Sequence, residues 1–342
     1  MPADPLNGLG PARRIDERLD RLYAIGGGPG ANRVGYTAAE DEAHRLAGGW
    51  MEEAGLEVSV DAAGNLIGRH PAGGSAWTGS HLDSVPGGGR YDGALGVVAG
   101  IEAVERAGRG AVVAFRDEER GCAGSRAFAD RPARFVELHV EQGSVLADGN
   151  APLGVVTGIA GVARGELVVE GRVGHAGTVP MEGRADALVA AAELVLRVRD
   201  AALAVEGAVA TVGRVVVEPG ALNVIPGRVT LSVDARAPDA ERFERLIAAL
   251  GLVTTYRNEP VALDESLRLV LREELSFRGL PTVDLPSGAG HDAGVLAAKG
   301  IPSAMLFVRS LNGGASHSPD ELSSQADVAL AVDVLASLLR RL

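Results

Sequence analysis

The stretch GSHLDSVPGGGRYDGALG, residues 79–96, places His81 two residues before Asp83 and eleven before Asp92, in a chain with only seven histidines. On an extended backbone His81 and Asp83 point to one face, so the carboxylate can hold the imidazole tautomer that a metal-binding His requires. The glycines permit a tight turn, and Asp92 lies near an expected helix start, where backbone N–H groups favour an anion. The stretch therefore indicates a candidate metal site beside a strand end.

The segments around this stretch alternate between helix-like and strand-like patterns. Helical spacing covers 37–55, which begins with the capping-box pair Thr37 and Glu40, and also 95–107. Strand patterns cover 56–71 as two short strands around an Ala-Gly-Asn turn, and also 76–80, 110–119 and 134–143. This alternation predicts a three-layer α/β domain, in which ligands gather at the carboxyl ends of the strands.

The pattern changes from about Leu153. Strands are expected at 153–171, 208–220, 227–236 and 251–258, and helices at 183–204 and 239–250. This βαββαβ order is typical of a small α+β sandwich. Since the alternating pattern returns afterwards, we expect a catalytic domain built from residues 1–152 and 261–342, with an inserted domain at 153–260.

Composition narrows the class of protein. The 33 Lys and Arg are outnumbered by 45 Asp and Glu, which argues against a nucleic-acid partner. No apolar run is long enough to span a bilayer and the start lacks a signal-peptide core, so we expect no membrane association and a cytoplasmic protein. Cys122 is the only cysteine, so a metal site would need His and carboxylate ligands.

Further acidic and imidazole residues follow strands or occupy loops. Glu118 and Glu119 are adjacent and point in different directions, so one can bind a metal while the other takes a proton. His139 lies between two glutamates, and His317 lies in a loop of small residues. With the 79–96 stretch, they form a set suited to two divalent ions that share a carboxylate, with Zn²⁺ and Mn²⁺ both plausible.

Each feature also has an ordinary structural explanation. An isolated His is usually a surface or core residue, an Asp-Gly pair is usually a turn, and adjacent glutamates after a strand are usually solvated. His44 and His70 are expected to be such ordinary surface or core histidines. On periodicity alone, ordinary roles as turn, capping or exposed charged residues are also favoured for a second group: His175, Asn223, Arg236 and His291.

Eight stretches together resemble the di-metal amidohydrolase and exopeptidase superfamily, in the branch of N-carbamoyl-L-amino-acid hydrolase, allantoate amidohydrolase and β-ureidopropionase. They match in order from about residue 37 to the C-terminus. The stretches are TGSHLDSVPGGGRYDGALGV, FRDEE, ELHVEQG, GVVTGIAG, GHAGTVPMEGRADA, NVIPG, SGAGHDA and SHSPDE. The resemblance implies a di-zinc exopeptidase-like catalytic domain with an inserted α+β domain that serves as lid and dimerisation domain.

The resemblance implies two divalent metal ions per subunit. Asp92 would bridge them, His81 and His139 would complete one site, and Glu119 and His317 would complete the other.

The resemblance also implies catalytic roles. Glu118 would be the general base, taking a proton from a metal-bridging water that attacks the carbamoyl carbon. Asp83 would hold His81, and His175 would stabilise the tetrahedral oxyanion. Five further residues match substrate-binding positions: Gln142, Arg164, Asn223, Arg236 and His291.

The implied activity is hydrolysis of a linear, non-peptide C–N bond in a carboxylate-bearing ureido acid, by a homodimer. Allantoate and N-carbamoyl amino acids are both candidate substrates. The context of RYDGALGV and Arg164 slightly favours allantoate. A metallo-aminopeptidase or dipeptidase is an alternative, although its matching ligand is more often a carboxylate than His139. An inactive binding protein on this scaffold is another, although all five ligand positions and Glu118 are present.

One departure concerns the segment between Glu119 and His139. Relatives of this kind carry several tens of residues there, including helices, whereas this chain has only RGCAGSRAFADRPARFVEL. The metal ligands are retained, so we expect an intact metal centre and an altered substrate pocket.

Overall fold

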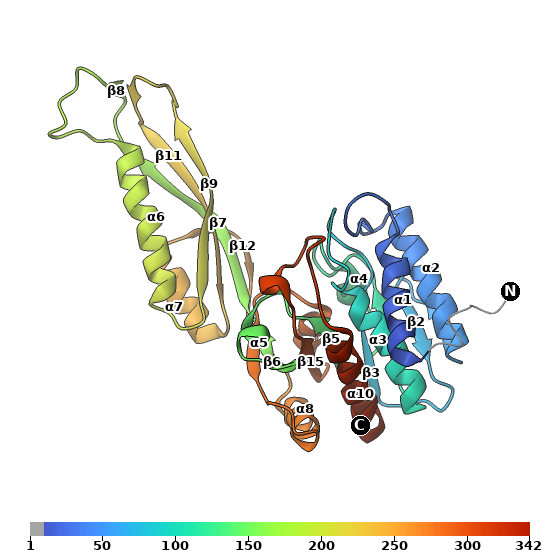
Figure 1. The fold of residues 1–342 in the computed structure, drawn as a ribbon. Helices are drawn as coiled ribbons and strands as arrows, with labels where there is room; N and C mark the ends of the chain where they lie inside the picture. Colours follow the sequence, from blue (N-terminus) through green and yellow to red (C-terminus); the bar gives the residue numbers. More distant parts are fainter. Residues whose placement is uncertain (1–9) are drawn as a thin grey trace. The chain divides into compact units, whose positions relative to one another are not determined.

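The structure, a computed structural model, describes residues 10–342 (Figure 1). The chain divides into two compact units. The first unit comprises the chain up to Thr157, Ala262–Leu285 and Ala289–Leu342, and the second comprises Gly158–Val261 with Pro286–Gly288. Within residues 10–342, no helix is both long and apolar enough to cross a membrane.

The first unit is built on a mixed β-sheet. Its strand order is β1-β2-β4-β3-β5-β15-β6-β13, and β14 pairs with β6. Strands β4, β3, β5 and β15 are parallel to their neighbours in this run, while β1, β2 and β6 pair antiparallel. The strands are β1 Glu57–Val60, β2 Leu66–Arg69, β3 Ala76–His81, β4 Ala111–Phe115, β5 Arg134–Val140, β6 Leu153–Ile159, β13 Val261–Ala262, β14 Asp284–Ser287 and β15 Ser303–Val308.

Helices cover both faces of this sheet. They are α1 Pro11–Tyr23, α2 Ala38–Glu53, α3 Ala94–Ala107, α4 Ala123–Ala127, α5 Val145–Asp148, α8 Glu265–Phe277, α9 Asp292–Ala298 and α10 Gln325–Arg341. Successive β5 residues point to opposite faces. Leu138 joins the core formed with α3 and α10, whereas Glu137 accepts a hydrogen bond from the backbone N–H of Ala293 in α9. The expected α/β architecture around a central mixed sheet is confirmed.

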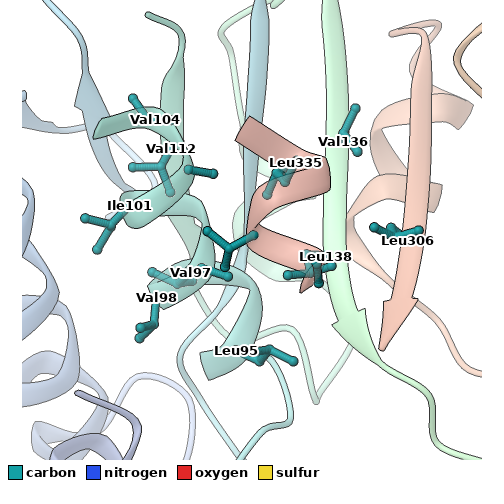
Figure 2. Packing of buried hydrophobic residues seen from close by; sticks show 14 of the residues in the cluster. Leu95, Val97, Val98, Ile101, Val104, Val112, Val136, Leu138, Leu306 and Leu335 are labelled. Atoms are coloured by element: carbon teal, nitrogen blue, oxygen red, sulfur yellow. The ribbon is translucent and has the colours of Figure 1, made fainter. Parts of the chain in front are cut away.

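Helix α3 lies at the centre of the core (Figure 2). Its apolar side chains pack with β4, β5, β15 and α10. Gly96 allows a close approach to β5, because a Cβ there would lie 2.3 Å from the carbonyl oxygen of Leu138. A Cβ at Gly100 would lie 2.9 Å from Cγ2 of Val112. The two glycines let α3 lie close to the sheet, and so fix the position of Asp92, two residues before the helix.

The second unit has the expected βαββαβ order, formed by β7, α6, β9, β11, α7 and β12. Its sheet order is β12-β7-β11-β9, with every pair antiparallel. Alternate residues of β11 and the apolar side of α7, including Phe243 and Leu246, form the core of this unit. The elements are β7 Gly161–Glu170, α6 Ala187–Leu203, β9 Val209–Glu218, β11 Arg228–Ala237, α7 Ala240–Leu250 and β12 Val253–Asn258, with β8 Gly174–His175 and β10 Val224–Ile225 as a separate pair.

Three local features differ from expectation. The region 153–171, expected to be a strand region of the inserted domain, divides into β6, which pairs with β15 in the sheet of the first unit, and β7 in the second sheet. Helix α1 has no counterpart in the sequence analysis, although its buried residues Ile15, Leu19 and Leu22 follow helical spacing. The predicted capping box is also wrong. Thr37 forms no side-chain cap and instead donates through Oγ1 to the carbonyl oxygen of Val34 at 2.6 Å. The predicted partner Glu40 accepts hydrogen bonds from other backbone N–H groups.

Candidate metal centre

The candidate site lies beyond the carboxyl ends of the four parallel strands, where ligands of α/β sheets are expected. His81 is the last residue of β3, and His139 is the last but one of β5. Glu118 and Glu119 follow β4, and His317 lies in the loop between β15 and α10. The structure therefore brings together residues that the sequence analysis connected only through separate motifs.

Asp92 lies between two groups of candidate ligands. His81, Asp92 and His139 form one group, and Asp92, Glu119 and His317 form the other; within each group the ligand atoms lie within 4.8 Å of one another. Oδ1 of Asp92 is 3.3 Å from Nε2 of His139 and 3.6 Å from Nε2 of His81. Its Oδ2 is 3.3 Å from Nε2 of His317, which is 3.4 Å from Oε2 of Glu119.

The two buried imidazoles are oriented by contacts at Nδ1. In His81, Nδ1 lies 3.2 Å from the carbonyl oxygen and 3.3 Å from Oδ1 of Asp83. In His139, Nδ1 lies 2.9 Å from the carbonyl oxygen of Val140. A proton on Nδ1 satisfies these oxygens and leaves the Nε2 lone pair facing Asp92, which is the tautomer that a metal ligand needs.

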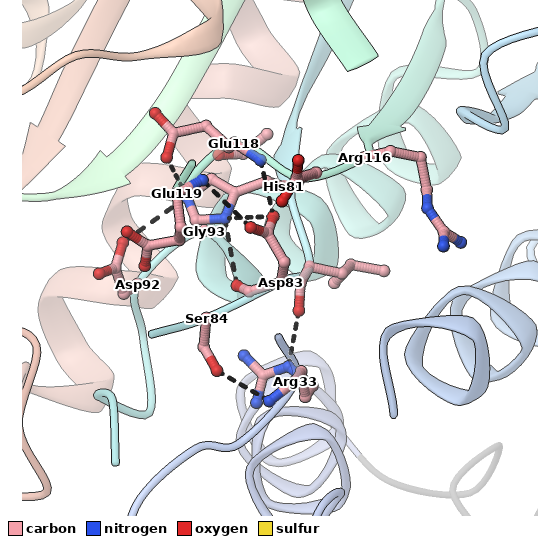
Figure 3. A network of polar contacts seen from close by, with 12 residues as sticks. Arg33, His81, Asp83, Ser84, Asp92, Gly93, Arg116, Glu118 and Glu119 are labelled. Carbon is pink, nitrogen blue, oxygen red and sulfur yellow. Dashed lines mark hydrogen bonds and ion pairs between the residues drawn. The ribbon is translucent and has the colours of Figure 1, made fainter. Parts of the chain in front are cut away.

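Asp83 has a second function besides contacting His81 (Figure 3). Its Oδ1 accepts a hydrogen bond from the backbone N–H of Glu118 at 3.0 Å, and its Oδ2 accepts one from Glu119 at 3.1 Å. Asp83 is fully buried. One carboxylate thus connects the His81 imidazole to the backbone of both adjacent glutamates.

The site concentrates negative charge in a buried volume. Burial raises the pKa of Glu118 well above its usual value, and the neighbouring Asp292 and Glu119 add to that effect. Burial opposes ionisation of Asp92 as well, but His139 and His317 outweigh it and hold the pKa of Asp92 well below its usual value. Carboxylates and imidazoles arranged in this way are a donor set for Zn²⁺ or Mn²⁺, whose charge would offset that of the acids.

Glu321 and Gln142 secure the shared carboxylate. Glu321 is buried, and its Oε1 accepts hydrogen bonds from the backbone N–H groups of Tyr91 at 2.6 Å and Asp92 at 3.0 Å. The Gln142 amide donates to Oδ2 of Asp92 at 3.1 Å and to Oγ of Ser316 at 3.0 Å. Glu321 was not predicted from the sequence, because its only signal was its place at the end of the SHSPDE motif.

Arg33 was also missed. It is fully buried, and it donates through Nε to the carbonyl oxygen of Leu82 at 2.7 Å (Figure 3). Through Nη1 it donates to the carbonyl oxygen of Leu22 at 2.9 Å. Burial lowers its pKa to about 10, while the nearby carboxylate of Asp83 opposes this shift. Arg33 therefore places a positive charge beneath the acidic site and holds the chain between His81 and Asp83.

A third group of possible ligand atoms comprises Glu137, His139 and His291. Glu137 is occupied, because it accepts hydrogen bonds from Oγ of Ser80 and the backbone N–H of Ala293, both at 2.7 Å. The ring of His291 lies 4.5 Å from that of His139, centroid to centroid. His291 is the N-cap residue of α9 but makes no side-chain cap, so its possible capping role is wrong.

The second unit carries the other predicted substrate contacts. His175 and Asn223 are exposed: His175 is the last residue of β8, and Asn223 directly precedes β10. The N–H of Ala176 donates to the carbonyl oxygen of Asn223 at 2.9 Å. Arg164 and Arg236 both donate through Nε to the carboxylate of Asp234 at 2.8 Å. The two guanidinium groups thus share one acidic partner, and their contact with substrate stays a prediction.

The short segment after Glu119 contains helix α4. Lys299, the only lysine in the chain, donates through Nζ to the carbonyl oxygens of Ser125, Arg126 and Phe128 at 3.1, 3.0 and 2.7 Å. A cation at the carboxyl end of a helix is favourable because it pairs with carbonyls that lack helical partners. This contact secures the shortened flank of the site.

Comparison with known proteins gives consistent matches. A model of peptidase family M20/M25/M40 matches residues 77–341. The chain is 37% identical to the N-carbamoyl-L-amino acid amidohydrolase of Geobacillus stearothermophilus, over 94% of this chain and 96% of that protein. It is 32% identical to the allantoate amidohydrolase of Bacillus subtilis, over 94% of each. The crystal structure of a hydantoinase/carbamoylase family amidase from Burkholderia multivorans matches with a TM-score of 0.86 and 30% identity, covering 96% of this chain and 97% of that one.

Proposed function

The chain belongs to peptidase family M20/M25/M40, and from that premise we propose that it is a metal-dependent amidohydrolase that cleaves a linear, non-peptide C–N bond of a ureido acid. The observation that carries this proposal is the position of Asp92, whose two carboxylate oxygens each lie 3.3 Å from an imidazole, His139 on one side and His317 on the other. A carboxylate placed in this way is suited to bridging two metal ions.

We infer two divalent ions, zinc or manganese, in the two ligand groups. His81, His139 and Asp92 would hold one ion, and Asp92, Glu119 and His317 would hold the other. When bound, such ions polarise a carbonyl group and lower the pKa of water. The imidazole and carboxylate donors fit both metals, so the choice between them needs measurement.

Glu118 is suited to be the general base. Its side chain is 9% exposed, and its Oε2 lies 3.8 Å from Nε2 of His81, beside the ligand groups. Burial raises the pKa of this carboxyl, which makes it a stronger proton acceptor than an exposed glutamate. Glu118 takes a proton from the attacking water and delivers it to the leaving nitrogen. The products of a carbamoyl substrate are ammonia, carbon dioxide and the free amino acid.

The substrate class follows from the relatives. The protein from Geobacillus stearothermophilus is named for N-carbamoyl-L-amino acids, and at 37% identity it is closer than the allantoate amidohydrolase of Bacillus subtilis at 32%. We therefore place N-carbamoyl-L-amino acids ahead of allantoate as the first substrates to test. Arg164 and Arg236 are suited to bind the carboxylate common to both, since guanidinium groups pair with carboxylates bidentately. His175 is the proposed oxyanion contact, and Asn223, Gln142 and His291 are further proposed contacts.

We propose a homodimer formed through the second unit, which would also act as a lid. Among the described strands, β9 pairs only with β11 and so forms an edge of the sheet. Val215 and Val216 on β9 are 48% and 41% exposed, and Leu196 on α6 is 52% exposed. An exposed apolar edge strand is a surface that pairs readily with another chain.

A substrate panel tests the proposal. Ammonia release would be measured from N-carbamoyl-L-amino acids, allantoate and β-ureidopropionate, and amino-acid release from dipeptides, with Zn²⁺ or Mn²⁺ supplied. We expect turnover of at least one ureido acid and none of the dipeptides. Turnover of dipeptides alone would make the protein a peptidase, and bound metal without any turnover would make it a binding protein.

A further inference from the structure

Four successive backbone N–H groups after β4 donate to side chains rather than to a neighbouring strand. They belong to residues 116–119, the segment that ends in the two functional glutamates. Their acceptors are Oδ1 of Asn65 for Arg116 at 3.0 Å, Oε1 of Glu40 for Asp117 at 2.9 Å, and the two oxygens of Asp83 for Glu118 and Glu119 at 3.0 and 3.1 Å. Because buried N–H groups need partners, these three side chains determine the path of the segment.

Glu40 contributes a contact from a distant element, helix α2. Its side chain is fully buried, and both carboxylate oxygens are used. Oε1 accepts from Asp117, while Oε2 accepts from the backbone N–H of Tyr36 at 2.6 Å and pairs with Nη2 of Arg116 at 2.8 Å. Burial raises the pKa of Glu40, whereas these N–H groups and Arg116 favour its ionised form.

The chain just before α2 fits closely against the same segment. Arg120 donates through Nη2 to the carbonyl oxygen of Gly35 at 2.8 Å and through Nε to Oδ1 of Asp117 at 2.6 Å. A Cβ at Gly35 would lie 1.9 Å from Oδ1 of Asp117, so only glycine fits there. Asp117 itself has φ +52°, an unfavourable backbone conformation for a residue with a side chain, which these contacts hold in place.

We propose that Glu40 is a positioning residue for the hydrolytic reaction: by fixing the backbone of Asp117, it sets the positions of Glu118 and Glu119. The inference rests on the proposed function, in which Glu118 moves the proton and Glu119 holds a metal ion. Neither role tolerates displacement, because misplacing a reacting group by about 1 Å can cost about 100-fold in rate. Glu40 acts through the backbone and does not contact the substrate.

The variant Glu40→Gln tests this inference. Glutamine has the same shape but only one acceptor oxygen, so it cannot accept from both Tyr36 and Asp117. We expect kcat to fall by roughly 10- to 100-fold, as for loss of other residues that orient metal ligands. We expect KM to stay within about threefold, because ground-state binding is not affected. In Mn²⁺ titrations of metal-free protein, one of the two ions should bind more weakly.

Two matched variants serve as controls. Glu42→Gln removes a carboxylate on the same helix that pairs only with the exposed Arg45, at 2.6 Å. Asp41→Asn removes the second carboxylate bound to Arg116, at 2.7 Å, and leaves the Asp117 contact intact. Both should keep the kcat, KM and Mn²⁺ affinity of the wild type.

Glu40→Asp covers the case in which the glutamine variant does not fold. It keeps the buried charge, but it is one methylene shorter and cannot reach both N–H groups, so we expect the same changes to a smaller extent. A folded Glu40→Asp or Glu40→Gln protein with a lowered melting temperature but unchanged kcat and Mn²⁺ affinity would overturn the inference. A wild-type protein that neither binds Mn²⁺ nor hydrolyses any ureido acid would instead overturn the proposed function.

Discussion

Asp83 holds Glu118 by the main chain and does not bind its carboxyl group: Oδ1 of Asp83 accepts from the Glu118 N–H at 3.0 Å, while the Glu118 carboxylate extends to within 3.8 Å of His81. The adjacent Glu119 is held in the same way, but its carboxylate points to His317. Two consecutive glutamates are thus anchored together by the main chain, and their carboxylates point to different histidines.

This division predicts different outcomes for two similar substitutions. Glu118→Gln should retain both metal ions and lose roughly 100- to 10,000-fold in kcat, the range expected for a general base. Glu119→Gln should lose one metal ion instead. Metal analysis of the purified variants, together with kcat, separates the two effects. If Glu118→Gln lost its metal and Glu119→Gln kept it, the two roles would be exchanged.

Removal of the metal should affect both activity and stability. Ions that bind only the folded state add stability by mass action, about 2.7 kcal/mol at a concentration 100-fold above Kd. We therefore expect a chelator to abolish activity and lower the melting temperature, and Zn²⁺ or Mn²⁺ to restore both. Differential scanning calorimetry with and without metal measures the change in melting temperature. A melting temperature that does not depend on metal would contradict the assignment of the ligands.

Gly35 provides a test of the tight fit around Asp117. Gly35→Ala would place a Cβ 1.9 Å from Oδ1 of Asp117, and such overpacking typically costs about 1–3 kcal/mol. Urea unfolding should show this loss, together with lowered kcat. Gly49→Ala in helix α2 is the control, because a Cβ there meets no atom within 4 Å and should stabilise the helix by about 0.5–1 kcal/mol. If the two variants had the same free energy of unfolding and the same kcat, the space around Gly35 would be large enough for a Cβ.

The buried imidazole of His44 should make the folded protein less stable at acid pH. Burial, with a smaller contribution from Arg116, lowers its pKa from 6.5 to about 3, so the folded protein keeps this imidazole neutral. Below pH 6.5 the unfolded chain takes up a proton that the folded chain does not, and stability falls until about pH 3. Relative to His44→Leu, the wild type should lose about 2 kcal/mol between pH 7 and pH 5. Parallel stability curves for the two proteins would contradict this.

The proposed dimer can be broken on strand β9. Val216→Lys places a charge on the exposed apolar edge and should shift the protein to monomers in sedimentation velocity, whereas Thr211→Lys on the same strand tests whether any added charge has this effect.

Mixing inactive Arg236→Ala and Glu118→Gln proteins should restore partial activity if a site takes Arg236 from the partner subunit. No recovery after proven subunit exchange would indicate self-contained sites.

Much of the fold could be predicted because hydrophobic periodicity reports how each segment is buried. The alternation of strands and helices around His81 and the βαββαβ order of the second unit both followed from that signal. Helix α1 was missed although its buried residues follow helical spacing. The capping box failed for a tertiary reason: Asp117 and Arg116, distant in sequence, bind the carboxylate of Glu40.

Some residues of the candidate site could likewise be predicted from the sequence, and others could not. Candidate metal ligands such as Asp92 and His139 could be proposed because several His and acidic residues in recognisable motifs form a set suited to metal binding. Residues that fix backbone N–H groups, such as Glu321 and Glu40, could not be found in this way. Their partners are main-chain atoms of any residue type, so no sequence pattern marks the contact.

The candidate ligands are divided by the inserted second unit: His81, Asp92, Glu119 and His139 precede it, and His317 follows it. During synthesis, a ribosome must pass residue 317 before the second ligand group is complete. A chain that stops inside the insertion has Asp92 and Glu119 but lacks their third partner. With the proposed ligand set, a chain interrupted inside the insertion could not form the second metal site.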